Sequence, residues 1–329
     1  MIIYSFSFTD KGDLLNRKIS ELLDTRAYLS GIVKGQLKEL TKTAFENADA
    51  VIFIGAAGIA VRAIAPFVKS KTADPAVIVC DELASFVIPI LSGHIGGAND
   101  LAQRLAALIG AVPVITTATD INGVWAVDTW AVKKGFKVYN ADSIKHISSA
   151  LLKGKSVGLI SDIELTDKLP DNVVFDNTSL ESGIVISPFI KKPFKHTLNL
   201  IPRCVCLGVG SKKDADKNAL CELTQKLLDE NRIDPYAVCA IATINIKCNE
   251  NAVLELCKKY SVPLTCYTAE QLNQIEGNFK TSDFVKSVTG TDNVCERSAV
   301  FVSSGWLIIN KTAGDGVTLA AAMKGVKKP

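Results

Sequence analysis

Four polar loops between residues 55 and 122 carry the side chains best suited to chemistry. Each loop follows an apolar run that predicts a buried strand. In an open parallel sheet, ligands bind at the carboxyl ends of the strands, so we expect the four loops to lie together. This stretch therefore predicts a ligand site.

The third loop, SGHIGGAND, combines the largest number of useful groups. It holds a histidine, which can change protonation near neutral pH and act as a general base. Its glycines allow a ligand to approach the backbone, and their N–H groups could stabilise an oxyanion. The alternative is a histidine with a purely structural role. The residues assigned here are His94 as the base and Ser92, Gly96, Gly97 and Asn99 as substrate contacts.

The other three loops would supply an anion site and carboxylates. In IGAAGIAVR, a predicted helix start could bind a carboxylate or phosphate through Gly55, Gly58 and Arg62. Its glycines could equally serve only a tight turn. Two carboxylates, Asp81 and Asp120, are candidate partners of the histidine, although the first could be a solvated turn residue. The fourth loop, TTATDING, also offers Thr117 and Asn122 as substrate contacts, with helix capping and a turn as the alternative.

A second set of candidates lies near the end of the chain. CLGVGSKKDAD predicts a strand, a tight turn and a helix that begins near Ser211, where N–H groups and lysines would bind an anion. Later turns would add polar groups at the same sheet edge. The substrate contacts assigned here are Gly208, Gly210, Lys212, Thr243, Lys247 and Glu296. Cys295 is a candidate for testing, with a buried structural thiol as the alternative.

Strands that alternate with helices position these loops. We expect strands at IIYSFS, VIFI, AVIV, FVIPIL and VPVIT, with helices at 12–23, 36–47, 59–68 and 99–109. From residue 203 a second such pattern begins, with helices at 214–231, 250–260 and 291–303. This spacing indicates βαβ units and mostly parallel sheets. The fold class is α/β, with two α/β domains and a small middle α+β domain.

The predicted domains are 1–135, 136–197 and 198–329. The middle domain has a short helix near 142–152 and brief strands at SVGLI and GIVIS. The stretch SPFIKKPFKHTLNLIP contains three prolines and several basic residues, which is typical of a linker.

Composition limits the class of function. The chain has 329 residues and a net charge of +3, without a long basic tract, which argues against nucleic acid as a partner. No apolar run approaches the ~18 residues of a membrane span, and the N-terminus does not resemble a signal peptide. We expect a cytoplasmic protein. The nine cysteines include no CxxC pair, which predicts reduced, mostly buried thiols and no metal site.

Taken together and in order, GIAVR, SGHIGGAN, TTATDING, LGVG, TINIK, VCERSA and GDGVTLAAA resemble the CbiG family of anaerobic cobalamin biosynthesis. The resemblance covers almost the whole chain and is weakest in the middle domain and before residue 51. The last domain is also similar to the single-domain CobE proteins.

The resemblance implies a cobalt-precorrin-5A hydrolase, an enzyme acting on a carbon–carbon bond. Such an enzyme opens the ring-A δ-lactone of a cobalt tetrapyrrole and releases acetaldehyde to give cobalt-precorrin-5B. Cobalt belongs to the substrate, so no protein cofactor is expected. The resemblance leaves open whether the protein forms a homodimer and whether it makes transient contact with other enzymes of the pathway. The alternatives are a non-catalytic tetrapyrrole-binding or handover protein and a nucleotide-dependent α/β enzyme, although the chain has neither a P-loop nor a complete GxGxxG fingerprint.

Overall fold

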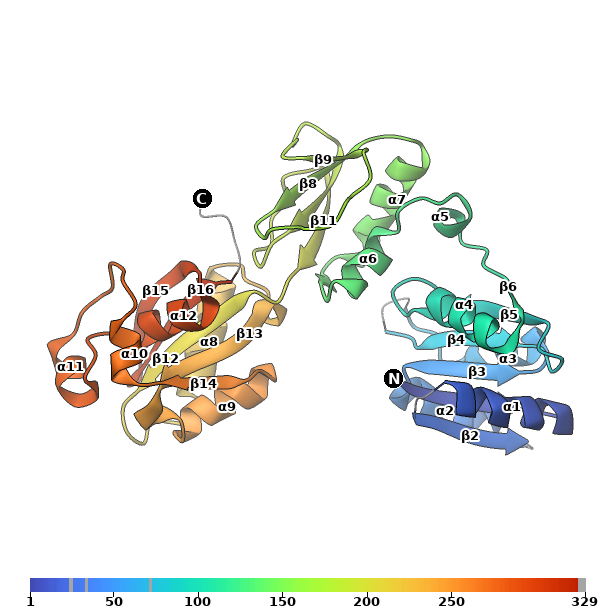
Figure 1. Cartoon of the computed structure of the whole chain (residues 1–329), viewed down its shortest axis with the longest axis horizontal. Helices are drawn as coiled ribbons and strands as arrows, with labels where there is room; N and C mark the ends of the chain where they lie inside the picture. Colours follow the sequence, from blue (N-terminus) through green and yellow to red (C-terminus); the bar gives the residue numbers. More distant parts are fainter. Residues whose placement is uncertain (24–25, 33–34, 71–72, 325–329) are drawn as a thin grey trace. The chain divides into compact units, whose positions relative to one another are not determined.

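The computed structural model describes residues 1–23, 26–32, 35–70 and 73–324 (Figure 1). The chain divides into two compact units, residues 1–132 and 133–329. The predicted first boundary, between 135 and 136, lies close to this division. The α/β fold class is confirmed, because each of three sheets contains parallel strand pairs and is accompanied by helices.

The first unit is built on a six-stranded sheet in the order β2-β1-β3-β4-β5-β6. Its elements are β1 (Ile2–Ser7), α1 (Asp10–Leu22), β2 (Arg26–Ile32), α2 (Leu37–Asn47), β3 (Ala50–Ile54), α3 (Ala57–Ile64), β4 (Ala76–Cys80), β5 (Phe86–Leu91), α4 (Ala98–Ile109), β6 (Val112–Pro113), α5 (Ala118–Ile121) and α6 (Val127–Lys133). Strand β2 was not predicted from the sequence.

Alternate residues of the central strands fill two separate cores, which explains why these strands are apolar throughout. Ile52 and Ile54 pack with α1 and α4 on one face of the sheet. Val51 and Phe53 pack with α2 and α3 on the other face. A strand buried on both faces has no polar side, so its sequence is a continuous hydrophobic run.

The direction of β5 contradicts the expected arrangement of the loops. Strands β1 to β4 are parallel to one another, but β5 runs antiparallel to β4, with Val77 beside Leu91 and Cys80 beside Val87. Strand β6 is parallel to β5. The loops after β3 and β4 therefore lie at one edge of the sheet, and the loops after β5 and β6 lie at the opposite edge.

The second unit holds two five-stranded sheets. The middle sheet has the order β7-β11-β10-β8-β9, and the last sheet has the order β14-β13-β12-β16-β15. The middle elements are β7 (Lys137–Val138), η1 (Ala141–Ser143), α7 (Ile144–Leu152), β8 (Val157–Ser161), β9 (Val173–Phe175), β10 (Ser182–Ile186) and β11 (His196–Ile201). Strand β11 pairs with β10, so the predicted linker at 187–202 is in part a sheet strand, and it crosses the predicted boundary at 197/198.

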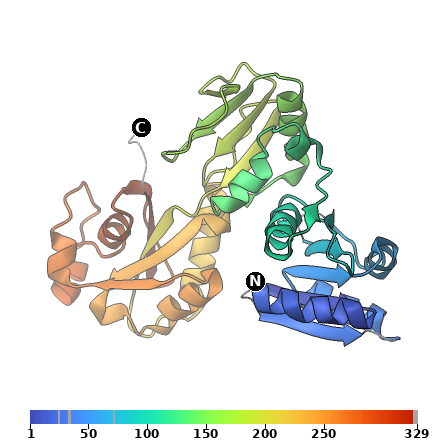
Figure 2. The same ribbon diagram turned by 45° about the vertical axis from the view of Figure 1, so that its right-hand side comes forward.

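The last sheet has helices on both faces (Figure 2). Its elements are β12 (Val205–Ser211), α8 (Ala219–Glu230), η2 (Pro235–Ala237), β13 (Val238–Ile244), η3 (Asn245–Lys247), α9 (Asn251–Tyr260), β14 (Leu264–Tyr267), α10 (Ala269–Asn273), α11 (Asp283–Thr289), α12 (Cys295–Ser303), β15 (Trp306–Gly314) and β16 (Val317–Met323). Helix α12 lies on β12, β13 and β16, and α8 packs with α9.

Gly208 permits the close packing of α12 on β12. A Cβ atom at this position would lie 1.8 Å from the Cys295 carbonyl oxygen and 2.6 Å from the Ala299 nitrogen. Both are backbone atoms of a packed helix, so neither can move without displacing it. The predicted role of Gly208 as a substrate contact is therefore not supported by its position, since the space above it is filled by protein.

Substitution of Gly208 with alanine is expected to destabilise the protein by about 3 kcal/mol, the upper end of overpacking costs. Urea unfolding followed by circular dichroism would measure the change. Gly58→Ala is the matched control, because a Cβ there meets nothing within 4 Å and alanine favours a helix by up to about 1 kcal/mol. Equal stability of the two variants would contradict this account of Gly208.

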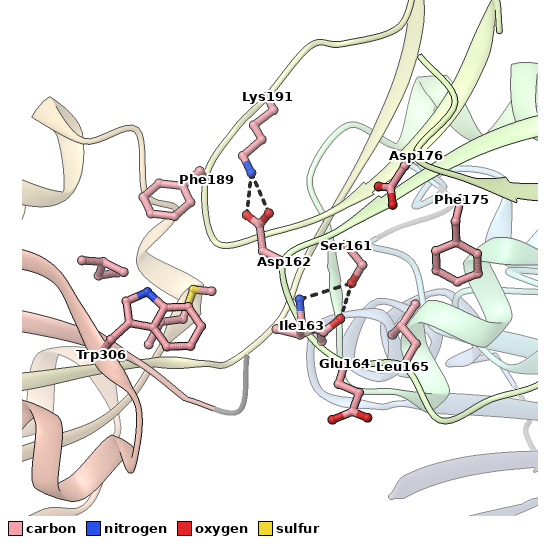
Figure 3. Close-up of a pocket in the computed structure, with 12 residues that line it drawn as sticks. Ser161, Asp162, Ile163, Glu164, Leu165, Phe175, Asp176, Phe189, Lys191 and Trp306 are labelled. Atoms are coloured by element: carbon pink, nitrogen blue, oxygen red, sulfur yellow. Dashed lines mark hydrogen bonds and ion pairs between the residues drawn. The ribbon is translucent and has the colours of Figure 1, made fainter. Parts of the chain in front are cut away.

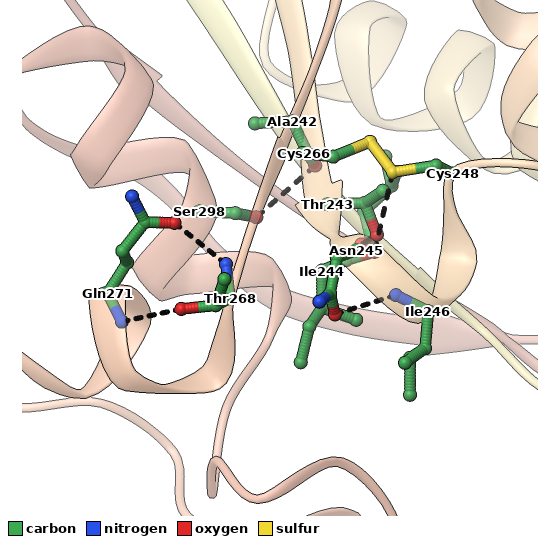
Figure 4. The surroundings of a disulfide bond; sticks show 11 residues. Ala242, Thr243, Ile244, Asn245, Ile246, Cys248, Cys266, Thr268, Gln271 and Ser298 are labelled. Atoms are coloured by element: carbon green, nitrogen blue, oxygen red, sulfur yellow. Dashed lines mark hydrogen bonds between the residues drawn. A yellow bond between two sulfur atoms is a disulfide. The ribbon is translucent and has the colours of Figure 1, made fainter.

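The cysteine prediction is wrong for two of the nine residues. A disulfide joins Cys248, directly after η3, to Cys266 on β14, with a Cα–Cα distance of 6.2 Å (Figure 4). The other seven cysteines are free, and four of them are buried. No group of three or more histidine, cysteine or acidic residues within the described ranges could hold a metal ion. None of the helices described is long and apolar enough to cross a membrane.

Candidate active site

His94 lies between two carboxylates at the edge of the first sheet where β5 and β6 end. Its Nδ1 is 3.2 Å from an Asp128 oxygen, and its Nε2 is 3.0 Å from an Asp120 oxygen. Each ring nitrogen therefore faces a carboxylate acceptor, which the imidazolium form satisfies by donating two N–H groups.

Three neighbours complete the polar cluster around the ring. Asn99 donates through Nδ2 to Asp120 at 2.8 Å and to Thr117 at 3.0 Å. The Thr119 hydroxyl lies 3.2 Å from His94 Nε2. We call His94, Asn99, Thr117, Thr119, Asp120 and Asp128 the histidine cluster.

The charge of His94 follows from these contacts. The hydrogen bond to Asp128 raises the pKa of His94 to about 9, and Asp120 adds to the effect, while burial opposes it. Burial would raise the pKa of Asp128, but the hydrogen bond and charge of His94 outweigh it and lower that pKa. At neutral pH the cluster thus holds an imidazolium, which has no lone pair for a proton. The predicted role of free histidine base does not fit this protonation state.

Asp128 was not predicted from the sequence. It lies on α6, 34 residues after His94, and is only 4% exposed. The sequence signal for Asp128 was a single aspartate within the mostly apolar run WAVDTWAV. An aspartate in such a run is expected to be buried, and buried carboxylates are almost always paired. Asp120, by contrast, is exposed and can reach a ligand.

Asp81 cannot act on His94, because it lies at the opposite edge of the sheet. Its carboxylate accepts the backbone N–H groups of Leu83 and Phe86 and closes the turn between β4 and β5. Desolvation would raise its pKa, but these backbone hydrogen bonds lower the pKa overall. The five-residue connection between Cys80 and Phe86 was the overlooked signal. Parallel neighbours need a crossover of about a dozen residues or more, whereas five residues suit a hairpin.

The first predicted anion loop shares that distant edge. Gly55 donates its N–H to the Cys80 carbonyl oxygen at 2.8 Å, which fixes the loop beside β4. Gly58 is inside the first turn of α3, and Arg62 is exposed in its last turn. Among the described residues Arg62 forms no ion pair. These groups could bind an anion, but not one held by the histidine cluster.

The SGHIGGAND loop is shaped mainly by its own hydrogen bonds. Ser92 has φ 55° and donates its hydroxyl to the Asp74 carbonyl oxygen at 3.0 Å, so it anchors the loop. Gly97 donates its N–H to the His94 carbonyl oxygen at 2.9 Å. The N–H of Gly97 is therefore unavailable as the predicted oxyanion donor. Gly96 donates to no protein group within the described ranges, and its Cβ position would meet Ser92 at 2.4 Å.

Asn122 contributes little to this cluster. It ends α5 and donates its side-chain amide to the Ala118 carbonyl oxygen at 2.8 Å. This contact matches the turn interpretation of TTATDING more closely than substrate binding.

The candidates in the second unit separate into buried and accessible residues. Thr243 is fully buried and donates to the Val209 carbonyl oxygen at 2.7 Å. Glu296 is 1% exposed and accepts the backbone N–H groups of Lys280 and Lys311. Both side chains are committed to structure. The predicted helix start at Ser211 is wrong, because β12 extends to Ser211 and α8 begins at Ala219.

Gly210, Lys212 and Lys247 line a cavity of about 620 Å³ in the last domain. Apolar residues such as Phe284 and Val288 form its walls, and Lys213 and Lys311 add two more amines. Cys295 also lines it but is buried, and burial raises the pKa of its thiol to about 11. We call this the lysine-rimmed cavity. Its composition suits an apolar ligand that carries carboxylates.

A second cavity of about 670 Å³ has the opposite charge. Asp162, Glu164 and Asp176 line it beside Phe189 and Trp306 (Figure 3). Its one lysine, Lys191, is paired with Asp162 at 2.6 Å. A polycarboxylate would be repelled here.

Comparison with known proteins identifies the family. Three family models match in order: cobalamin synthesis G N-terminal at residues 39–120, cobalamin biosynthesis central region at 125–202, and cobalamin synthesis G C-terminus at 205–322. A cobalt-precorrin-5A hydrolase of Salmonella typhimurium is 33% identical, with 95% of each chain covered. Another from Priestia megaterium is 28% identical over 98% of this chain and 88% of that protein.

Among solved structures, a cobalamin biosynthesis protein G homologue from Sulfolobus solfataricus is 24% identical, covering 98% of this chain and 96% of that one, with a TM-score of 0.42. The sequence matches alone, which extend over nearly the full length with the three family regions in order, show that the chain belongs to the CbiG family of cobalamin-synthesis proteins.

Proposed function

We propose that this protein is a hydrolase of cobalamin biosynthesis that acts on cobalt-precorrin-5A. The observation that carries the proposal is a histidine ring held between a buried and an exposed carboxylate, in a chain related over its length to hydrolases of that name. A water-activating carboxylate beside a fixed cation is suited to opening a lactone.

Asp120 is the base in this scheme. It is exposed, and one of its oxygens is held by His94 Nε2 and Asn99 Nδ2, which fixes the orientation of the carboxylate. It takes a proton from the attacking water as the water oxygen bonds to the lactone carbonyl carbon. Once protonated, Asp120 holds the imidazolium more weakly, and the Nε2–H of His94 can donate to the developing oxyanion.

Collapse of the tetrahedral intermediate breaks the lactone C–O bond, and the proton held by Asp120 passes to the departing oxygen. A ring-A acetate and a C20 alcohol remain. A base then removes the proton of this hydroxyl group, and the bond between C20 and the macrocycle breaks. The electron pair of that bond passes into the conjugated ring, and the C20 fragment leaves as acetaldehyde. The protein supplies proton transfer and charge stabilisation, and the substrate supplies the electron sink.

Incubation with cobalt-precorrin-5A tests the proposal. An enzyme releases acetaldehyde in catalytic excess over protein, which a coupled alcohol dehydrogenase assay measures. A binding or handover protein would retain the substrate without releasing acetaldehyde, and that result would overturn the proposal. Thermal stabilisation by nucleotides would instead support the nucleotide-dependent alternative.

The lysine-rimmed cavity is proposed as a binding site for the same substrate. Its apolar walls can cover the face of a macrocycle, and Lys212 and Lys311 can pair with peripheral carboxylates. Lys247 is partly neutralised by Glu250 at 2.9 Å, so Lys212 is the better residue to test.

Lys212→Ala is expected to raise KM about fivefold with little change in kcat, the size of one partly exposed ion pair. Steady-state kinetics with cobalt-precorrin-5A would show this split. Lys226→Ala is the matched control, because that lysine is exposed on α8 outside the cavity. An unchanged KM in the Lys212 variant would remove the cavity from substrate binding.

A further inference from the structure

A pocket in the middle domain gathers five groups that are or can become cationic. They come from two segments, the start of α7 and the stretch that leads into β11, and they are Lys145, His146, Lys192, Lys195 and His196. These residues line a cavity of about 380 Å³ and are here called the histidine–lysine pocket. The mechanism above uses none of them.

The two imidazole rings are stacked face to face. Their centroids are 3.9 Å apart, with an interplanar angle of 10°. Both side chains are partly exposed, so their nitrogen atoms are accessible to a ligand.

Few carboxylates oppose this positive charge. Glu181 pairs with Lys195 at 2.6 Å and lies 3.7 Å from His196, and Asp142 is the single acidic residue among those that line the pocket. Lys145 and Lys192 form no ion pair within the described ranges. The pocket therefore has an excess of positive charge and two free amines.

An anion fits this pocket better than a metal ion. Lysine amines repel a cation, and the described residues contain no cluster of three ligands here. The pKa of His146 is lowered, first by desolvation and then by the positive charges of His196, Lys145 and, more weakly, Lys195. The negative charge of Glu181 opposes this decrease. A bound anion would reverse the effect of these positive charges, so binding would be coupled to proton uptake.

We propose that the histidine–lysine pocket binds clustered carboxylates on the edge of the tetrapyrrole. This inference rests on the function proposed above and extends it by giving the middle domain a part in substrate recognition. Free phosphate has similar charged oxygens, so the test must separate these two sources.

The chain has only three histidines, which makes the pocket visible by NMR. Protein labelled with ¹³C at the histidine ring would be titrated with an octacarboxylate porphyrin and, in parallel arms, with a dicarboxylate porphyrin and tripolyphosphate. Single substitutions of His94, His146 and His196 assign the three signals. We expect the octacarboxylate to shift the signals of His146 and His196 and to raise the pKa of His146.

Lys145→Ala combined with Lys192→Ala is expected to weaken this response about tenfold, since each lost pair contributes up to about 1 kcal/mol. Lys153→Ala is the control, because it ends the same helix outside the pocket. The inference would be overturned if the octacarboxylate left the His146 and His196 signals unchanged, or if the double variant responded as strongly as wild type. It would also be overturned if tripolyphosphate bound more tightly than the octacarboxylate. Acetaldehyde release by wild-type protein is measured separately, so the proposed function can stand if the pocket fails.

Discussion

Asp120→Asn is expected to lower kcat for cobalt-precorrin-5A by about two to four orders of magnitude, the usual contribution of a general base. Asparagine has nearly the same shape and can still accept from Asn99 through its carbonyl oxygen. It cannot take a proton from water. Acetaldehyde release under saturating substrate would measure the loss, with circular dichroism to confirm folding.

Glu82→Gln provides the matched control for this substitution. Glu82 is also a partly exposed carboxylate after a strand of the same sheet, but it lies at the opposite edge, where it accepts from Thr9. Its kcat should stay within about twofold of wild type, as for most surface changes. Full turnover by the Asp120→Asn variant would show that Asp120 is not the general base.

Asp128→Asn is expected to shift the alkaline limb of the pH–rate profile to a pH that is lower by one to two units. In the wild-type protein the pKa of His94 is raised to about 9, first by its hydrogen bond to Asp128. Without this carboxylate, the pKa should fall toward the unperturbed value near 6.5. A reaction that needs the imidazolium would then decline at lower pH, which initial rates between pH 6 and pH 10 would show.

The same substitution is expected to change how the free energy of unfolding depends on pH. His94 has a higher pKa in the folded state than in the unfolded state, so its contribution is complete below pH ~6.5 and disappears as pH rises through about 9. The Asp128→Asn variant should therefore lose stability against wild type near pH 7, by about 1.5–3 kcal/mol, the usual contribution of a hydrogen bond to a charged group. The difference should shrink above pH 9. A pH-independent difference would mean that the pair is not ionic.

Much of the local structure could be predicted from the sequence. The apolar runs at 51–54, 76–79 and 86–91 are strands, and the segment after SGHIGG is a helix. Both could be predicted because buried strands and half-buried helices leave different patterns of apolar residues in the sequence. The loop contents were also informative, since the structure brings His94 and Asp120 within 3.0 Å of each other. Their catalytic roles remain predictions.

Contacts between distant segments were not predictable in the same way. Asp128 is 34 residues from His94, and no local pattern indicates that a buried aspartate on α6 will meet a particular histidine. The start of α8 was misplaced because Ser211 to Lys213 has polar residues typical of a helix start, whereas pairing of β12 with β16 keeps Ser211 in a strand. Strand pairing is a tertiary interaction that overrides local preference.

The sequence alone determined the α/β class, the polar loops and the family, because these depend on residue types and their spacing. Only the tertiary structure decided which loops share an edge of the sheet. The antiparallel direction of β5 separates Asp81 from His94 and leaves Asp120 and Asp128 as its partners. That arrangement also raises the pKa of His94 to about 9, because carboxylates flank both ring nitrogens, and a protonated ring is the basis for proposing His94 as a cation instead of a base.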